Sequence, residues 1–224
     1  MDRRPVPETI INNLRVNLDT NRDIISTFKE IEKGHWDYLD NYRDQDRVRY
    51  PTMSIYQFSQ KVLSSKGIRT GKGDIQNYIR IFNRYKKSLP TAGVVFYHRA
   101  PSASSASESN IYFVVVRMRF SGVWSMPKGK KELNEELMRT AKREFLEETG
   151  IDLEDHISAT TAKTNINKTL FYLVESDSMN NKFDGYNQRE IEEVRWVNAA
   201  EATNVSEYSR QTVAVAKFLM SKEI

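Results

Sequence analysis

Cysteine is absent from the 224 residues of the chain. The sequence therefore excludes a disulfide framework, a thiolate metal site and a cysteine nucleophile. Histidine is nearly as scarce, and His35, His98 and His156 lie far apart in the sequence. Any metal ion would thus bind oxygen ligands or one of these scattered imidazoles, because no histidine cluster is available.

Long hydrophobic runs are also missing. No apolar segment approaches the roughly 20 residues that cross a bilayer, and the N-terminal MDRRPVPET has no signal-peptide core. We therefore expect no membrane partner and a cytoplasmic location. The hydrophobic and charged fractions, 39% and 29%, are those of an ordinary globular protein.

Charge is distributed unevenly along the chain. Residues 1–89 contain 17 Lys and Arg against 11 Asp and Glu, a net charge of +6, whereas residues 90–224 contain 17 against 19, a net charge of −2. Together these values give the net charge of +4 of the whole chain. A basic first part joined to an acidic second part suits a polyanionic substrate that contacts both.

Residues 1–89 show helical periodicity. Apolar residues recur at helical spacing over residues 21–42 and in two later segments, for which Ser54 (or Thr52) and Asp74 are suitable N-caps. The length of this part is sufficient for a separate domain. We predict an all-helical domain.

After residue 90 the pattern changes to short β-type runs, with a final helix over residues 207–221. The serine-rich segment 100–110 is predicted to be a hairpin loop. The predicted fold class is therefore α + α/β: an N-terminal all-helical domain (1–89) and an α/β/α sandwich domain (90–224). The strands are expected at residues 93–97, 111–116, 156–162, 169–174 and 194–197.

The stretch from Gly129 to Ile151 follows a strict spacing. It matches G-x5-E-x7-R-E-U-x-E-E-x-G-U, where U is aliphatic or aromatic, at every specified position. Asn134 is a suitable N-cap and Gly150 a suitable left-handed C-terminal residue for a helix in between. The apolar side of that helix would consist of Leu137, Met138, Ala141 and Phe145.

Three carboxylates share one face of this predicted helix. Glu144, Glu147 and Glu148 stand at positions i, i+3 and i+4, where like charges destabilise a helix by a few tenths of a kcal/mol per pair. A hard divalent cation reverses that effect, because it binds carboxylate oxygens. The spacing predicts metal ligands, and the alternative is a solvated acidic helix face.

This spacing resembles the Nudix box of a family that hydrolyses a nucleoside diphosphate linked to another group. The resemblance implies a Nudix sandwich whose loop–helix–loop motif holds Mg²⁺ or Mn²⁺ for metal-assisted hydrolysis. It implies Glu144, Glu147 and Glu148 as catalytic metal ligands, supplemented by the carbonyl oxygen of Gly129 or Lys128.

The same resemblance assigns the basic residues of the box. Arg143 is expected to orient the carboxylates, with Glu135 as its partner. Lys128 and Lys130 flank the glycine and are expected to neutralise substrate phosphate charge, the alternative being ordinary loop lysines.

The flanking segments resemble a narrower family, the catalytic subunit of the mRNA-decapping enzymes. Residues 124–130, WSMPKGK, resemble its W-G-F-P-K-G-K segment, with Ser and Met replacing Gly and Phe. Residues 85–93 resemble the start of its Nudix domain, and residues 31–40, IEKGHWDYLD, resemble I-E-x-A-H-W-F-Y-x-D of its helical domain. The resemblance covers roughly residues 5–200 and is weak over residues 43–51.

By this resemblance, Trp36 and Asp40 bind the cap. They are four residues apart and would share one helical face. An indole stacks on 7-methylguanine, whose positive charge adds ~1–2 kcal/mol when desolvated, and a carboxylate accepts from the N1–H and N2–H of guanine. The alternative is a core tryptophan beside a surface aspartate.

One further glutamate is implied by the segment 190–196, which resembles E-I-x-x-I-x-W of the same family. There the first glutamate is a general base or an extra metal ligand, so this role falls to Glu190, with Glu192 and Glu193 as neighbouring alternatives. Further candidates for contact with the cap or the RNA backbone are Tyr208, Arg210 and Lys217.

These features predict mRNA decapping, a metal-dependent hydrolysis that releases 7-methyl-GDP and leaves a 5′-monophosphate RNA. The expected partner is 5′-capped RNA and not DNA. One alternative is a Nudix hydrolase of small nucleoside or inositol polyphosphates, whose binding would depend less on salt than RNA binding does. The other is a non-catalytic cap- or RNA-binding module, which the complete set of glutamates disfavours.

Overall fold

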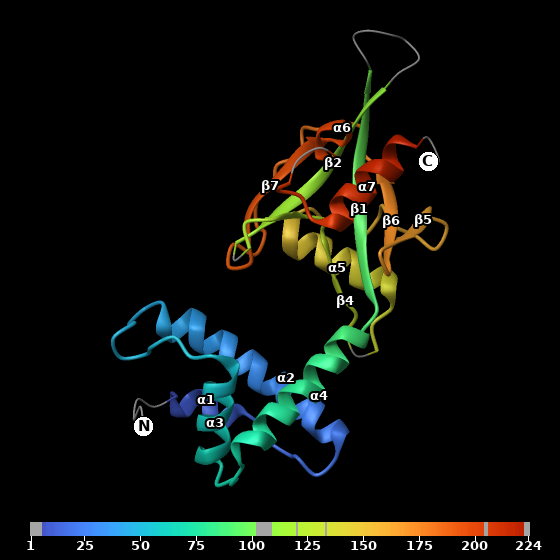
Figure 1. Cartoon of the computed structure of the whole chain (residues 1–224). Coiled ribbons are helices and arrows are strands. Elements are labelled where there is room, and N and C mark those ends of the chain that lie inside the picture. Colours follow the sequence, from blue (N-terminus) through green and yellow to red (C-terminus); the bar gives the residue numbers. More distant parts are fainter. Residues whose placement is uncertain (1–5, 102–108, 120, 133, 204–205, 222–224) are drawn as a thin grey trace. The chain divides into compact units, whose positions relative to one another are not determined.

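The computed structural model describes most of the chain, namely residues 6–101, 109–119, 121–132, 134–203 and 206–221 (Figure 1). The chain divides into two compact units, Met1–Leu89 and Pro90–Ile224, called here the helical unit and the sheet unit. Within the described residues, the first unit contains helices alone and the second a seven-stranded sheet with helices. This confirms the predicted fold class.

From residue 6 to residue 89, the helical unit consists of four α-helices and one π-helical turn. Ser54 caps the third α-helix, because its hydroxyl accepts from the Gln57 N–H while the Gln57 side chain accepts from the Ser54 N–H. The fourth helix begins two residues before the predicted cap, since the Asp74 carboxylate accepts from the Gly71 N–H at 2.8 Å. The elements are α1 (Glu8–Asn13), α2 (Asn21–Tyr38), the π-helix (Leu39–Arg43), α3 (Ile55–Ser65) and α4 (Lys72–Ser88).

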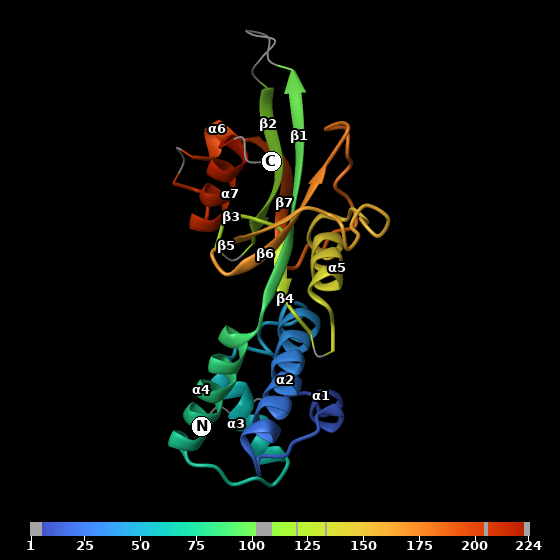
Figure 2. The ribbon, with the colours of Figure 1, turned by 90° about the vertical axis from the view of Figure 1, so that its right-hand side faces the viewer.

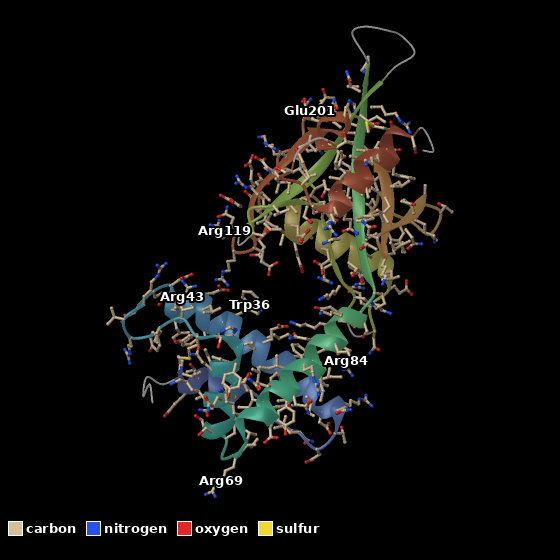
Figure 3. All side chains as sticks on the ribbon, in the orientation of Figure 1. Trp36, Arg43, Arg69, Arg84, Arg119 and Glu201 are labelled. Atoms are coloured by element: carbon tan, nitrogen blue, oxygen red, sulfur yellow. The ribbon has the colours of Figure 1, made fainter. Side chains whose placement is uncertain are left out.

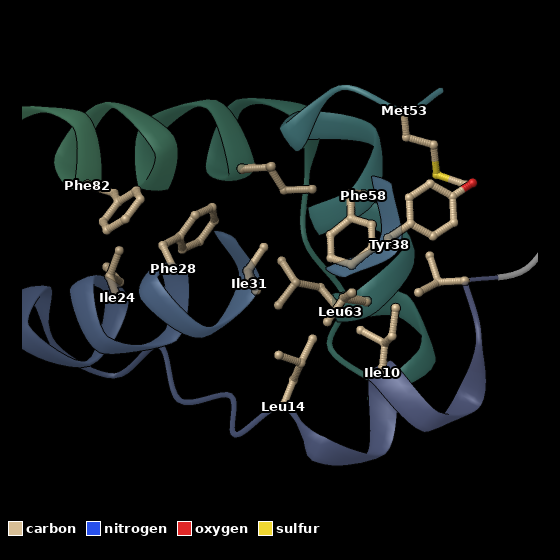
Figure 4. Close-up of a cluster of buried hydrophobic side chains, with 13 residues drawn as sticks. Ile10, Leu14, Ile24, Phe28, Ile31, Tyr38, Met53, Phe58, Leu63 and Phe82 are labelled. Carbon is tan, nitrogen blue, oxygen red and sulfur yellow. The ribbon is translucent and has the colours of Figure 1, made fainter. Parts of the chain in front are cut away.

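One hydrophobic cluster holds these helices together (Figure 4). Phe28 and Ile31 of α2 are fully buried in it, together with Phe58 of α3. Tyr38 is buried as well, and its hydroxyl donates to the Pro51 carbonyl at 2.7 Å, so its polar atom is satisfied. The apolar stripe of α2 thus forms the centre of the unit.

The sheet unit is organised around β1. This strand pairs antiparallel with β2 and β4, and parallel with β6. α5 covers one face of the sheet, and α6 and α7 cover the other (Figure 2), with a hydrophobic cluster on each face. The elements are β1 (Thr91–Pro101), β2 (Ser109–Met118), β3 (Trp124–Ser125), β4 (Lys128–Lys130), α5 (Leu137–Thr149), β5 (Lys163–Ile166), β6 (Thr169–Glu175), β7 (Ile191–Asn198), α6 (Ala199–Ala202) and α7 (Arg210–Met220).

One predicted strand is wrong. Residues 156–162 form turns, and the strand begins only at Lys163. The Ser158 N–H donates to the Thr161 hydroxyl at 2.8 Å and the two neighbouring hydroxyls of Ser158 and Thr160 are bonded to each other. Hydroxyl side chains of this kind satisfy backbone groups locally and so compete with strand pairing.

The start of α5 also differs from the prediction. Asn134 has a left-handed backbone with φ of 62° and does not cap the helix, which begins at Leu137 after Glu136. At the other end, Gly150 ends the helix in the left-handed conformation, as predicted.

Of the serine-rich segment, residues 102–108 lie outside the described part of the chain, although the strands on either side of it pair as a hairpin. Among the described residues, no helix has the length and apolar character of a membrane span.

Candidate active site

The first glycine of the box lies directly against the first glutamate of α5. Gly129 is in β4, where it pairs with Ala92 of β1. A Cβ atom on Gly129 would lie 1.9 Å from Cδ of Glu144 and 2.1 Å from each of its carboxylate oxygens. Only glycine leaves room for the Glu144 carboxylate at this point, which gives a steric reason for the residue type at position 129.

Arg143 connects the carboxylates of the box. Its guanidinium forms a two-pronged pair with Glu135, at 2.8 Å from Nε and 3.1 Å from Nη2. The Nη1 atom lies 2.8 Å from a Glu144 oxygen and 3.2 Å from a Glu147 oxygen. The expected pairing with Glu135 is therefore present, and Arg143 is in a position to orient two of the three predicted ligands.

Glu135 is held as a carboxylate by this pairing. The hydrogen bonds from Arg143 lower the pKa of Glu135 to about 2, and bonds from the Glu132 N–H and the Thr140 hydroxyl act in the same direction. A permanently ionised Glu135 fixes the guanidinium, since charge-assisted paired hydrogen bonds are the stronger kind.

Glu148 is the most buried of the predicted ligands, with 8% of its surface exposed. Burial raises the pKa of Glu148 to about 8; the Lys128 N–H, which donates to its carboxylate at 3.0 Å, opposes the shift, and the charges of Glu144 and Glu190 increase it. Burial also raises the pKa of Glu144, against the opposing effect of Arg143, and the charges of Glu147 and Glu190 raise it further. The carboxylates of Glu144, Glu147, Glu148 and Glu190 are therefore close enough to repel one another electrostatically. Glu190 joins this group although it lies more than forty residues further along the chain.

This donor set fits a hard divalent cation. All of its side chains offer carboxylate oxygen, and two of them, Glu144 and Glu148, are disfavoured as anions where they lie. Within the described residues, no three acidic or histidine side chains are already gathered as a metal-binding group. Glu144 is turned to Arg143 and Glu148 to the Lys128 N–H, so binding of an ion would require these side chains to exchange partners.

A basic pocket of about 480 Å³ adjoins the box. It brings Lys128 and Lys130 together with Arg210, the first residue of α7, which lies some eighty residues later in the chain. Gln211 closes one side by donating to the Ile166 carbonyl and the Thr169 hydroxyl. None of the lining residues is acidic; besides the three basic residues they are Thr91, Gly129, Asn167, Thr169 and Gln211. No local sequence signal indicates this convergence.

The predicted cap-binding residues lie in the helical unit. Trp36 is 46% exposed and projects from α2 (Figure 3), so it is not a core tryptophan. Asp40 is half-buried in the π-helical turn that continues α2, and such turns are frequent at functional sites. Neighbouring His35 is structural: it is bonded to the Met53 carbonyl at 2.7 Å and burial lowers its pKa.

Three aromatic residues, all from the segments singled out in the sequence, pack within the sheet unit. Trp124, the first residue of the WSMPKGK segment, is 2% exposed and lies under the Arg195 guanidinium at 4.0 Å. Tyr208 is half-buried beside it, and its hydroxyl accepts from Arg195 at 3.5 Å. Trp196 packs on Phe96 with ring centroids 5.4 Å apart, at the edge of the hydrophobic cluster beneath α5.

Comparisons with known proteins give one family match and several similar proteins. The NUDIX domain profile matches residues 97–217, more than half of the chain. The mRNA decapping complex subunit 2 of Schizosaccharomyces pombe is 24% identical over 191 residues, which are 82% of this chain and 24% of that protein. The mRNA-decapping enzyme subunit 2 of Arabidopsis thaliana is 25% identical over 173 residues, 74% of this chain and 43% of that protein. The chain thus spans less than half the length of these curated relatives.

Solved structures of other proteins are similar to part of the chain. An Ap4A hydrolase of C. elegans, in a binary complex, is 15% identical with a TM-score of 0.43, covering 59% of this chain and 96% of its own. A mutT/nudix family protein from Listeria innocua is 12% identical with a TM-score of 0.42, covering 60% of this chain and 92% of its own.

Proposed function

The chain belongs to the Nudix family, and we propose that it hydrolyses the 5′ cap of RNA, releasing 7-methyl-GDP and leaving a 5′-monophosphate RNA. The observation that carries this proposal is an exposed Trp36 followed by Asp40 in a basic helical unit joined to a complete Nudix box. Similarity to the decapping subunit of Schizosaccharomyces pombe extends over 82% of the chain, well beyond the Nudix match. The partner is 5′-capped RNA and the compartment is the cytoplasm.

Cap recognition is assigned to the helical unit. The exposed face of Trp36 stacks on 7-methylguanine, whose positive charge strengthens the contact by ~1–2 kcal/mol when water is excluded. Asp40 accepts from the two N–H groups on the Watson–Crick edge of guanine, a pair of donors that adenine does not offer. Together these contacts select the methylated base.

Hydrolysis is assigned to the sheet unit. Glu144, Glu147 and Glu148 would hold Mg²⁺ or Mn²⁺ with the Gly129 carbonyl, and such an ion, when bound, polarises phosphoryl oxygens. Arg143 keeps two of these carboxylates oriented through its contacts with both.

Two further groups of the sheet unit act on the substrate. Glu190, whose charge influences Glu144 and Glu148, accepts the proton of the attacking water as general base. Lys128 and Lys130 neutralise the phosphates, together with Arg210 in the basic pocket.

The test is a single-turnover assay with RNA labelled in its cap, supplied with Mg²⁺ or Mn²⁺, alongside the free cap dinucleotide. We expect release of 7-methyl-GDP from RNA and little cleavage of the dinucleotide. Glu148→Gln, which removes one ligand with little change of shape, should abolish turnover. Release of 7-methyl-GMP, or cleavage of small nucleotides alone, would refute the proposal and favour a Nudix hydrolase of small nucleoside polyphosphates.

A further inference from the structure

The helical unit contains a cavity of about 250 Å³ between α2, α4 and the start of α3. Its deepest residues are aromatic: Phe28 is 0% exposed and Phe82 4%. Ile55 and Ile79 are half-buried beside them. The remaining lining residues are polar or amphipathic, namely Glu32, His35, Trp36, Asn83 and Lys86. We call this space the α2–α4 cavity.

The size of the α2–α4 cavity limits its ligand to one planar group. An apolar protein cavity of roughly 150 Å³ holds a benzene ring. A volume of about 250 Å³ accommodates a larger ring system, such as a nucleobase, but not a peptide segment. The accessible parts of Ile55 and Ile79 and the indole of Trp36 form an apolar surface for such a ring, with the buried phenylalanines beneath them.

The polar side of the cavity matches the edge of a base. The Asn83 side chain is exposed and offers both a donor and an acceptor. Lys86 donates and Glu32 accepts, and the two form an ion pair that holds the corner of the cavity in place. A donor and an acceptor beside an apolar floor are the elements by which proteins read unstacked bases.

We propose that the α2–α4 cavity binds the base of the first nucleotide after the cap, beside the cap base on Trp36. Trp36 lines the cavity itself, so a base bound in the cavity would lie next to a cap base stacked on the indole. The helical unit's net charge of +6 favours a nucleic acid as the ligand over an uncharged partner. The inference rests on the proposed function, because capped RNA is the substrate that carries such a base.

The first experiment compares capped RNA that has adenine at the first position with the same RNA carrying an abasic ribose there. Stacking of one base on aromatic side chains contributes from about fivefold to more than a hundredfold in affinity. We expect the abasic RNA to be cleaved about tenfold more slowly at subsaturating protein. Equal rates for the two RNAs would overturn the proposal.

Two variants assign this difference to the cavity. Asn83→Ala removes the amide that contacts the base edge, and Ile79→Phe fills the space, so both should bring the ratio of the two rates towards one. Asn77→Ala is the matched control, since Asn77 is on the same helix, is exposed and does not line the cavity. If Asn83→Ala left the ratio of the two cleavage rates unchanged, the base of the first nucleotide would not bind in the α2–α4 cavity.

A binding measurement keeps this inference separate from the proposed function. Isothermal titration without added divalent metal compares the cap dinucleotide 7-methyl-GpppA with its analogue lacking adenine. Tighter binding of the complete dinucleotide to the wild type, lost in Asn83→Ala, supports the cavity even if no capped RNA is hydrolysed. Equal binding of the two compounds would overturn the inference even if decapping is confirmed.

Discussion

A single missing methyl group determines where Glu144 lies. The residue type at position 129 matters because a Cβ atom there would overlap the Glu144 carboxylate at 1.9–2.1 Å. The overlapping atoms are the far end of the flexible Glu144 side chain and not backbone. A Cβ atom at position 129 would therefore displace the carboxylate while leaving the fold intact. Residue 129 is thus a positioning residue for the site.

Gly129→Ala should therefore lower activity without unfolding the protein. Displacement of a reacting group by about 1 Å costs on the order of a hundredfold in rate, and we expect a loss of this size in kcat. Thermal unfolding followed by circular dichroism should change by only a few degrees. A variant with normal kcat would show that Glu144 does not need its present position.

Glu148 makes stability depend on pH in the metal-free protein. Its pKa is raised from 4.5 to about 8, so the folded state binds a proton that the unfolded state releases. The free energy of unfolding should then fall as pH rises from about 4.5 to about 8, by roughly 4 kcal/mol. Urea unfolding at pH 5 and pH 8 measures the change.

Glu148→Gln provides the control for this dependence, because the amide has no proton to lose. The variant should show a smaller fall in stability over the same pH range. Addition of Mg²⁺ to the wild type should reverse the fall at pH 8, since a cation favours the ionised carboxylate. A wild type and a variant with the same pH profile would contradict the assignment to Glu148.

At the scale of elements, α5 owes its position to its two ends. The helix begins directly after Glu136, and two residues earlier the backbone of Asn134 is left-handed. At its end Gly150 has φ of +77°, and a Cβ atom there would lie 1.6 Å from the Asp184 carbonyl oxygen. Backbone, and not a flexible side chain, opposes a substitution at this end.

Gly150→Ala should consequently destabilise the protein instead of affecting catalysis directly. The left-handed backbone costs an alanine about 1–2 kcal/mol, and the clash with Asp184 adds to it, so we expect a loss of about 2–4 kcal/mol. Denaturant unfolding gives the value. Gly67→Ala is the control, because Gly67 has a similar φ of +75° but nothing within 4 Å of the added Cβ atom. This variant should lose only the ~1–2 kcal/mol of stability that the left-handed backbone costs an alanine.

At the scale of the whole molecule, positive charge is shared between the units. The helical unit carries +6, and the sheet unit, although net acidic, gathers Lys128, Lys130 and Arg210 around one pocket. Phosphate contacts of this kind contribute to affinity in a salt-dependent way that does not depend on base sequence. The basic pocket is therefore expected to bind the backbone of a long substrate more than a short one.

Arg210→Ala tests this expectation. Binding of RNA should weaken, and the slope of log affinity against log salt should decrease by about 1, because one phosphate contact is removed. Lys217, the other basic candidate on this helix, does not line the pocket, so Lys217→Ala should leave the slope unchanged. An unchanged salt slope in Arg210→Ala, measured by filter binding over a salt series, would exclude Arg210 from the RNA contact.

Sequence reasoning succeeded where the relevant residues are close along the chain. The helix that carries Glu144, Glu147 and Glu148, its glycine end and the capped third helix follow from periodicity and from capping rules. It failed where tertiary or local side-chain bonds compete, as in the turns of residues 156–162 and the left-handed Asn134.

The sequence by itself determined the fold class and the row of carboxylates on α5, because both depend on repeats of a few residues. Tertiary structure alone decided that Glu144 lies against Gly129, that Glu148 is buried enough for a pKa of about 8, and that Arg210 joins Lys128. The α2–α4 cavity, too, exists only because the tertiary structure brings α2, α3 and α4 together. These features depend on burial and on contacts between residues far apart in the chain, and the spacing of residues along a sequence does not encode either.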